Sequence, residues 1–87
     1  MKRQLLPHLL ALVLLPLNLP AAMRVFSCEP GWAALVTELA GEHAEVFSAT
    51  TAQQDPHYIQ ARPSLIARMR RADLVVCTGA ELETGWL

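Results

Sequence analysis

His57 is the residue of this chain whose type and setting best suit chemistry. It follows Asp55 and Pro56 within a polar stretch, residues 50–62. A neutral imidazole is a borderline ligand that suits Zn²⁺, Mn²⁺ and related ions. Pro56 fixes its own φ angle and Asp55 can accept a hydrogen bond within a turn, so both are typical turn residues. The spacing alone permits a metal ligand at His57, and it equally permits a loop histidine without a partner.

The two cysteines, Cys28 and Cys77, are the other reactive side chains. They do not form a CxxC pair, so a thioredoxin-like redox motif is absent. Three interpretations stay open at Cys28: a disulfide with Cys77, a buried thiol, or a lipid anchor at a loose lipobox over residues 25–28. Arg24 and Phe26 fit a lipobox poorly, so we expect no lipid anchor.

Several acidic side chains lie near these residues. The Glu29 carboxylate could be stabilised by the dipole at the N-terminus of a helix, or it could orient the His57 ring. We favour the interaction with the helix dipole. Glu81 and Glu83 are expected to stabilise a helix start without touching a metal. His43 is expected to lie on the surface.

The first residues, 1–22, have the pattern of a signal peptide. Residues 2–3 are basic, residues 5–19 are mostly apolar, and residues 21–22 are small alanines near a cleavage point. Prolines interrupt the apolar run, which is short for a membrane span. The sequence therefore predicts export to the periplasm, with His8 lost in the cleaved leader.

Composition excludes some classes of protein. The net charge is −1, so no basic field indicates nucleic-acid binding. Arg68, Arg70 and Arg71 have the spacing of the wet face of a helix. The 53% hydrophobic content is inflated by the leader. Residues 23–87 suffice for one small α/β layer, and a chain of that size buries only about 60% of its unfolded surface.

Hydrophobic periodicity predicts alternating strands and helices. In chain order we expect a strand at 23–28, a helix from 30 to 40, a strand at 44–49, a loop at 50–62, a helix from 63, a strand at 74–77, a turn at Gly79 and a helix start at 81–87. Such alternation is typical of α/β proteins with a parallel sheet. His57 then follows the carboxyl end of the second strand, at the edge where open α/β sheets bind ligands.

The same pattern gives finer expectations. The second strand mixes polar residues and should lie at the sheet edge, whereas the continuous apolar run 74–77 suits a central strand covered on both faces. The first and third strands should be neighbours, which would bring both cysteines within disulfide reach. Leu65, Ile66 and Met69 should face the core, and Trp32 and Trp86 should pack helices onto the sheet.

An ordered set of short motifs resembles a known family. The motifs are Asp55-Pro56-His57, Pro63-Ser64, the run 72–76, the run 79–83 and Trp86-Leu87. Together they resemble the N-terminal lobe of the substrate-binding proteins of zinc and manganese ABC importers, over residues 25–87. No single motif is specific; the order of the set carries the resemblance. Many relatives begin the first helix with Ser/Thr-rich sequence, whereas this chain has the run 28–32, which leaves the choice of metal open.

The resemblance implies a metal site and a role. His57 would be the first ligand of Zn²⁺, or alternatively Mn²⁺, bound as the transported substrate. Family members supply the other ligands from a second histidine further along the first lobe and from two residues of the second lobe. We therefore expect a signal peptide at 1–22 and a partial N-terminal lobe at 23–87, truncated from a longer protein.

The resemblance also implies partners. The protein would be a periplasmic monomer that delivers its metal to an ABC permease in the inner membrane, and it would not be an enzyme. Two alternatives of other classes are a small exported α/β interaction module without metal, and a thiol hydrolase that uses Cys28 with His57.

Overall fold

The computed structural model describes residues 21–87. The predicted signal peptide therefore lies almost entirely outside the described residues. In chain order the elements are β1 (Met23–Ser27), α2 (Pro30–Ala40), the 3₁₀ turn η1 (Gly41–His43), β2 (Ala44–Ser48), the 3₁₀ turn η2 (Pro56–Tyr58), α3 (Pro63–Arg70) and β3 (Leu74–Val76). The predicted α/β order is confirmed up to the end of β3. Within residues 21–87, no helix is both long and apolar enough to cross a membrane.

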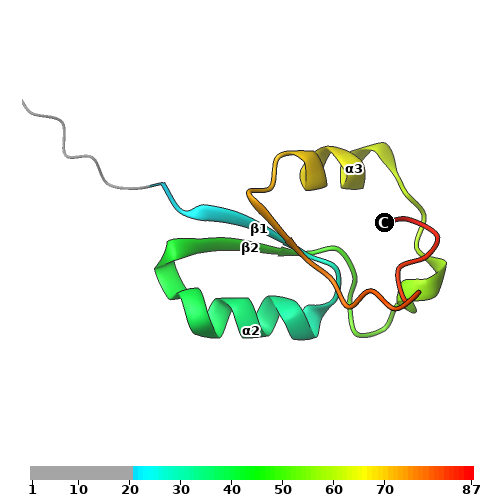
Figure 1. Cartoon of the computed structure of the whole chain (residues 1–87), viewed down its shortest axis with the longest axis horizontal. Coiled ribbons are helices and arrows are strands. Elements are labelled where there is room, and N and C mark those ends of the chain that lie inside the picture. The colour runs from blue at the N-terminus through cyan, green and yellow to red at the C-terminus, as the bar shows by residue number, and fades with distance from the viewer. Residues whose placement is uncertain (1–20) are drawn as a thin grey trace, which may run out of the picture.

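The three strands form one parallel sheet in the order β2-β1-β3. In Figure 1, α2 and α3 lie on opposite sides of this sheet. The edge position of β2 and the adjacency of β1 and β3 are confirmed. The prediction of a central third strand is wrong, because β1 takes the middle and β3 lies at the other edge. Leu74 and Val75 are accordingly exposed, at 46% and 41%.

The core gathers on the face of the sheet that α3 covers. Phe26 of β1 is fully buried, and it packs with Leu65 of α3 and with Trp86. Phe47 of β2 lies beside Phe26, with 5.5 Å between ring centroids. The Arg68 guanidinium lies over the Phe47 ring, 4.2 Å from its centroid. The apolar side of the sheet thus holds α3 through aliphatic, aromatic and cation–π contacts together.

The two helices begin and end as their sequences require. Pro30 and Pro63 each open a helix at a position where the missing N–H costs nothing. Gly41 ends α2 with φ at 54°, a region that glycine enters without steric cost. Of the predicted inward residues of α3, Leu65 is buried and Met69 packs against the core, but Ile66 is exposed. The prediction for Ile66 is wrong.

The segment after β3 turns instead of forming the predicted helix at 81–87. Gly79, Ala80 and Glu81 all have positive φ, at 75°, 52° and 72°. Three successive residues in that region cannot start a right-handed helix. The chain continues in turns closed by short backbone bonds, such as Leu82 N–H to Gly79 O at 3.0 Å.

A disulfide joins Cys28, just after β1, to Cys77, just after β3, with the Cα atoms 4.9 Å apart. Of the three interpretations left open at Cys28, the structure supports the disulfide. In this disulfide state the Cys28 sulfur is not the free nucleophile that a thiol hydrolase would need. The bond closes a loop across 49 positions of sequence and thereby restricts the unfolded chain.

Replacing both cysteines, as Cys28→Ala/Cys77→Ala, should lower the free energy of unfolding by up to about 4 kcal/mol, the chain-entropy value for a loop of this size. Urea unfolding of the parent and the double variant measures the difference. Reducing the parent should reproduce the loss, and equal stability of the oxidised and reduced parent would contradict the prediction.

Candidate metal centre

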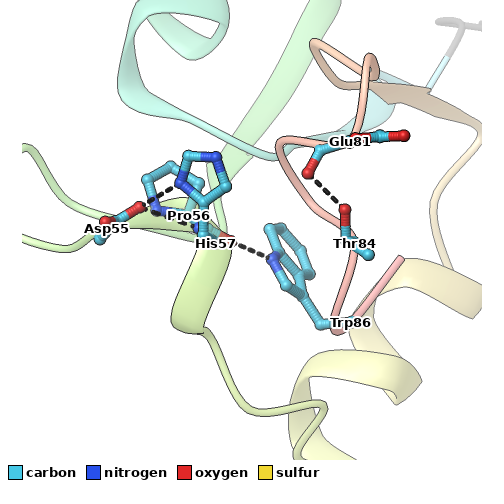
Figure 2. A network of polar contacts seen from close by, with 6 residues as sticks. All are labelled: Asp55, Pro56, His57, Glu81, Thr84 and Trp86. Atoms are coloured by element: carbon cyan, nitrogen blue, oxygen red, sulfur yellow. Dashed lines mark hydrogen bonds and ion pairs between the residues drawn. The ribbon is translucent and has the colours of Figure 1, made fainter.

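His57 lies in a tight turn that Asp55 organises. The Asp55 carboxylate accepts the His57 backbone N–H at 3.0 Å, and the same oxygen lies 2.7 Å from His57 Nδ1 (Figure 2). Both side chains are about half exposed, at 54%. The expected turn-forming role of Asp55 is thus confirmed, and the ring contact is an additional role that the sequence analysis did not assign.

The contact with Asp55 fixes which nitrogen of His57 is available. The hydrogen bond from the His57 backbone N–H, followed by the bond from its ring, holds the pKa of the Asp55 carboxyl below its usual value. An ionised carboxylate only accepts hydrogen bonds, so Nδ1 of the neutral ring must carry the proton. Nε2 is then left with a free lone pair, on a side chain that is 54% exposed. This is the arrangement by which a carboxylate orients a metal-binding histidine.

Trp86 holds the other side of the same turn. Its indole N–H donates to the Pro56 carbonyl at 2.7 Å, and Figure 2 shows the indole beside the turn that carries His57. Trp86 is nearly buried, with 7% of its surface exposed, and it belongs to the core cluster. The backbone under His57 is therefore tied to the packed part of the molecule, although the ring itself is exposed.

The loop of His57 begins at the carboxyl ends of the strands, as predicted. The Ala49 N–H donates to Ser27 O at 2.8 Å, and the Thr50 hydroxyl donates to Cys28 O at 2.8 Å. Thr50 is buried, with 2% exposed. These bonds anchor the start of the loop against the end of β1.

Glu29 does not orient His57. It is the N-cap residue of α2, but its side chain makes no capping bond. One oxygen accepts the Thr78 hydroxyl at 2.8 Å, and that hydroxyl also accepts the Trp32 indole N–H at 2.9 Å. The other oxygen, Oε2, is buried without a hydrogen-bond partner. Burial is the main reason why the pKa of the Glu29 carboxyl is raised from its ordinary value of 4.5, with the charge of Glu83 adding to it.

Glu83 has a structural role that sequence reasoning missed. Only 2% of it is exposed, and its carboxylate accepts the backbone N–H groups of Thr78 at 2.8 Å and of Gly79 at 3.0 Å. The predicted helix-start role is therefore replaced by one of closing the turn after β3. A carboxylate four or five residues after a glycine turn is a weak signal, which gains meaning only once the turn is known.

Among residues 21–87, His57 belongs to no group of three metal-binding side chains. The one such group in this part of the chain consists of Cys28, Cys77 and Glu83, and its cysteines are bonded to each other. His43 lies exposed at the end of η1, as predicted. The structure thus presents His57 as a single oriented donor.

Comparison with known families gives one match. A family model described as zinc-uptake complex component A periplasmic matches residues 25–87. The chain belongs to this family. The resemblance that rested on the ordered motifs is confirmed over the same residues, and the turn of Asp55 and His57 lies within the matched range. No curated protein and no solved structure gives a significant match.

Replacing Asp55 by asparagine should disturb the His57 ring more than its backbone. The amide side chain would keep an oxygen that accepts the His57 backbone N–H, but it would lack the charge that holds the proton on Nδ1. Nitrogen chemical shifts of the neutral imidazole distinguish the two tautomers. We expect the Nδ1–H form to dominate in the parent and to lose population in Asp55→Asn; an unchanged tautomer ratio would contradict this.

Glu29→Gln should raise the free energy of unfolding at neutral pH. The folded-state pKa of Glu29 is raised, so the folded protein holds this proton more tightly than the unfolded chain does. The stability that this bound proton contributes is fully present below the ordinary glutamate pKa of 4.5, and it is lost as the pH rises through the folded-state pKa of Glu29. Glutamine keeps an acceptor for the Thr78 hydroxyl and carries no charge.

Thermal unfolding of Glu29→Gln and the parent across pH measures this effect, and the difference should narrow below pH 4.5. Glu38→Gln, an exposed substitution on α2, is the matched control and should follow the parent at each pH. A difference that persists in acid would show that the charge of Glu29 is not its cause.

Proposed function

We propose that this protein is a periplasmic metal-binding component of an ABC importer and that it carries Zn²⁺ as its transported substrate. Two observations support the proposal: the family match over residues 25–87 and the turn in which Asp55 orients His57. The family description names zinc uptake and the periplasm. The partner that follows from this role is a membrane permease that receives the metal.

The geometry of His57 is the observation that carries the chemical part of the proposal. A metal ligand needs a neutral ring with one nitrogen free, and Asp55 leaves Nε2 free. The exposed fraction of the side chain, 54%, leaves room for an ion and for further ligands. A protein zinc site uses about four donors. We propose that His57 supplies one and that parts of the protein other than residues 21–87 complete the site.

Zinc is favoured over manganese by the donor itself. Imidazole nitrogen suits zinc, whereas manganese sites draw more on carboxylate, carbonyl and water oxygen. Asp55 is engaged with two N–H groups of His57, so we assign it the orientation of the ring and not metal ligation. Manganese remains the alternative substrate, and a site whose other ligands are carboxylates would favour it.

His57→Ala should sharply weaken zinc binding by the intact protein while leaving its fold unchanged, because an exposed loop side chain supports no core. Asp55→Asn should weaken it by about 10- to 100-fold, the usual effect of losing the partner that orients a ligand. Competition with a coloured zinc chelator measures both affinities. Binding should also weaken in acid, since a proton competes with the metal for the imidazole.

His43→Ala is the matched control for this experiment, because it removes an exposed histidine from another turn of the same protein. It should bind zinc as the parent does. Equal zinc affinity of His57→Ala and the parent would remove His57 from the site and would overturn the metal-binding assignment.

A further inference from the structure

The one group of three metal-binding side chains among residues 21–87 does not contain His57 and includes both sulfurs of the disulfide. Sγ of Cys28, Sγ of Cys77 and a carboxylate oxygen of Glu83 all lie within 4.8 Å of one another. Cys28 and Glu83 are buried, with 0% and 2% of their surfaces exposed, and Cys77 is partly buried. Two sulfurs and one carboxylate are a donor set that suits zinc.

From this geometry we propose that the protein has two exclusive states at this position: a disulfide, and a dithiol that binds Zn²⁺ through Cys28, Cys77 and Glu83. This site is separate from the one proposed at His57. Three protein ligands leave the fourth position of a tetrahedral ion open to water.

The backbone keeps the two sulfurs together when the disulfide is absent. The Cys28 N–H donates to Val76 O at 2.9 Å, directly beside Cys77. Further along the same strand pair, the Asp73 N–H donates to Arg24 O at 2.8 Å. Parallel pairing of β1 with β3 therefore fixes both Cα positions independently of the bond between the side chains.

Glu83 is held ready to serve as the third ligand. Backbone N–H groups of Thr78 and Gly79 bind its oxygens and fix its rotamer. Oε1 accepts both N–H groups, whereas Oε2 accepts only that of Gly79 and has a further lone pair for a metal.

Reduction by an external dithiol, followed by zinc binding, converts the disulfide state into the zinc-bound state. A small dithiol reductant attacks the disulfide and supplies two electrons and two protons; it leaves as its own disulfide and Cys28 and Cys77 become thiols. Zinc binding then releases both thiol protons to solvent, because the thiolate is the ligand. Reoxidation by an exchange partner reforms the bond and expels the ion.

Cobalt(II) tests the proposal because thiolate ligation gives a charge-transfer absorption that imidazole and carboxylate do not give. Protein reduced with a phosphine and then freed of it should develop this absorption when titrated with Co²⁺, and Zn²⁺ should abolish it. The oxidised protein should not develop it. Absence of the band in the reduced protein would overturn the proposal, whether or not that protein stays folded.

Glu83→Gln separates a built site from a pair of thiols that bind metal in a disordered chain. It keeps both cysteines and should weaken cobalt binding by at least about tenfold, the lower limit for losing even an orienting partner. Glu81→Gln, an exposed change two positions away, is the control and should bind as the parent does. Equal affinity of Glu83→Gln and the parent would overturn the assignment of Glu83.

His57→Ala should keep the charge-transfer band, so the result is independent of the proposed transport site. The redox equilibrium gives a second measure. Once the zinc concentration exceeds the Kd, each further tenfold increase should make the apparent reduction potential of the disulfide about 30 mV less negative, because zinc binds only the reduced form. A potential that does not respond to zinc would contradict the exclusive relation of the two states.

Discussion

The carboxyl end of β1 is the constraint on which the rest of the structure depends. β1 is the central strand, and its last residues bind both neighbours: the Cys28 N–H reaches β3, while Ser27 and Cys28 carbonyls hold the start of the loop after β2. The covalent bond to Cys77 reinforces the first of these contacts. Parallel pairing sets these strand ends at one edge, so the loop with His57 and the turn with Glu83 both leave from this edge.

Much of this arrangement was predictable from the sequence because it depends on local order. Proline openings, Gly41 and the apolar strands define β1, α2, β2, α3 and β3 within one or two residues. The position of β3 was not predictable, because a continuous apolar run such as 74–76 indicates burial but does not fix whether the strand lies at the centre or at the edge of the sheet. The turn at 79–81 was not predicted, because two non-glycine residues there adopt positive φ angles, which alanine and glutamate rarely do.

The place of His57 in the loop after β2 was predictable from the sequence, and its assignment as a ligand, which came from the family resemblance, stays a prediction. The hydrogen bond that selects its tautomer was not predictable, because it depends on how Asp55 folds back in η2. Glu29 shows the opposite case. Its position at the start of a helix suggested a dipole role, but the hydroxyl of Thr78, 49 positions away, determines where its carboxylate lies.

The bond between Trp86 and Pro56 connects two regions that are 30 positions apart. The indole is buried in the core on one side and touches the backbone of the His57 turn on the other. Its emission depends on the polarity and hydrogen bonding around this ring, so the protein contains an intrinsic optical probe at the base of its candidate site. A ligand that draws the turn outward would lengthen this bond and change the signal without any added label.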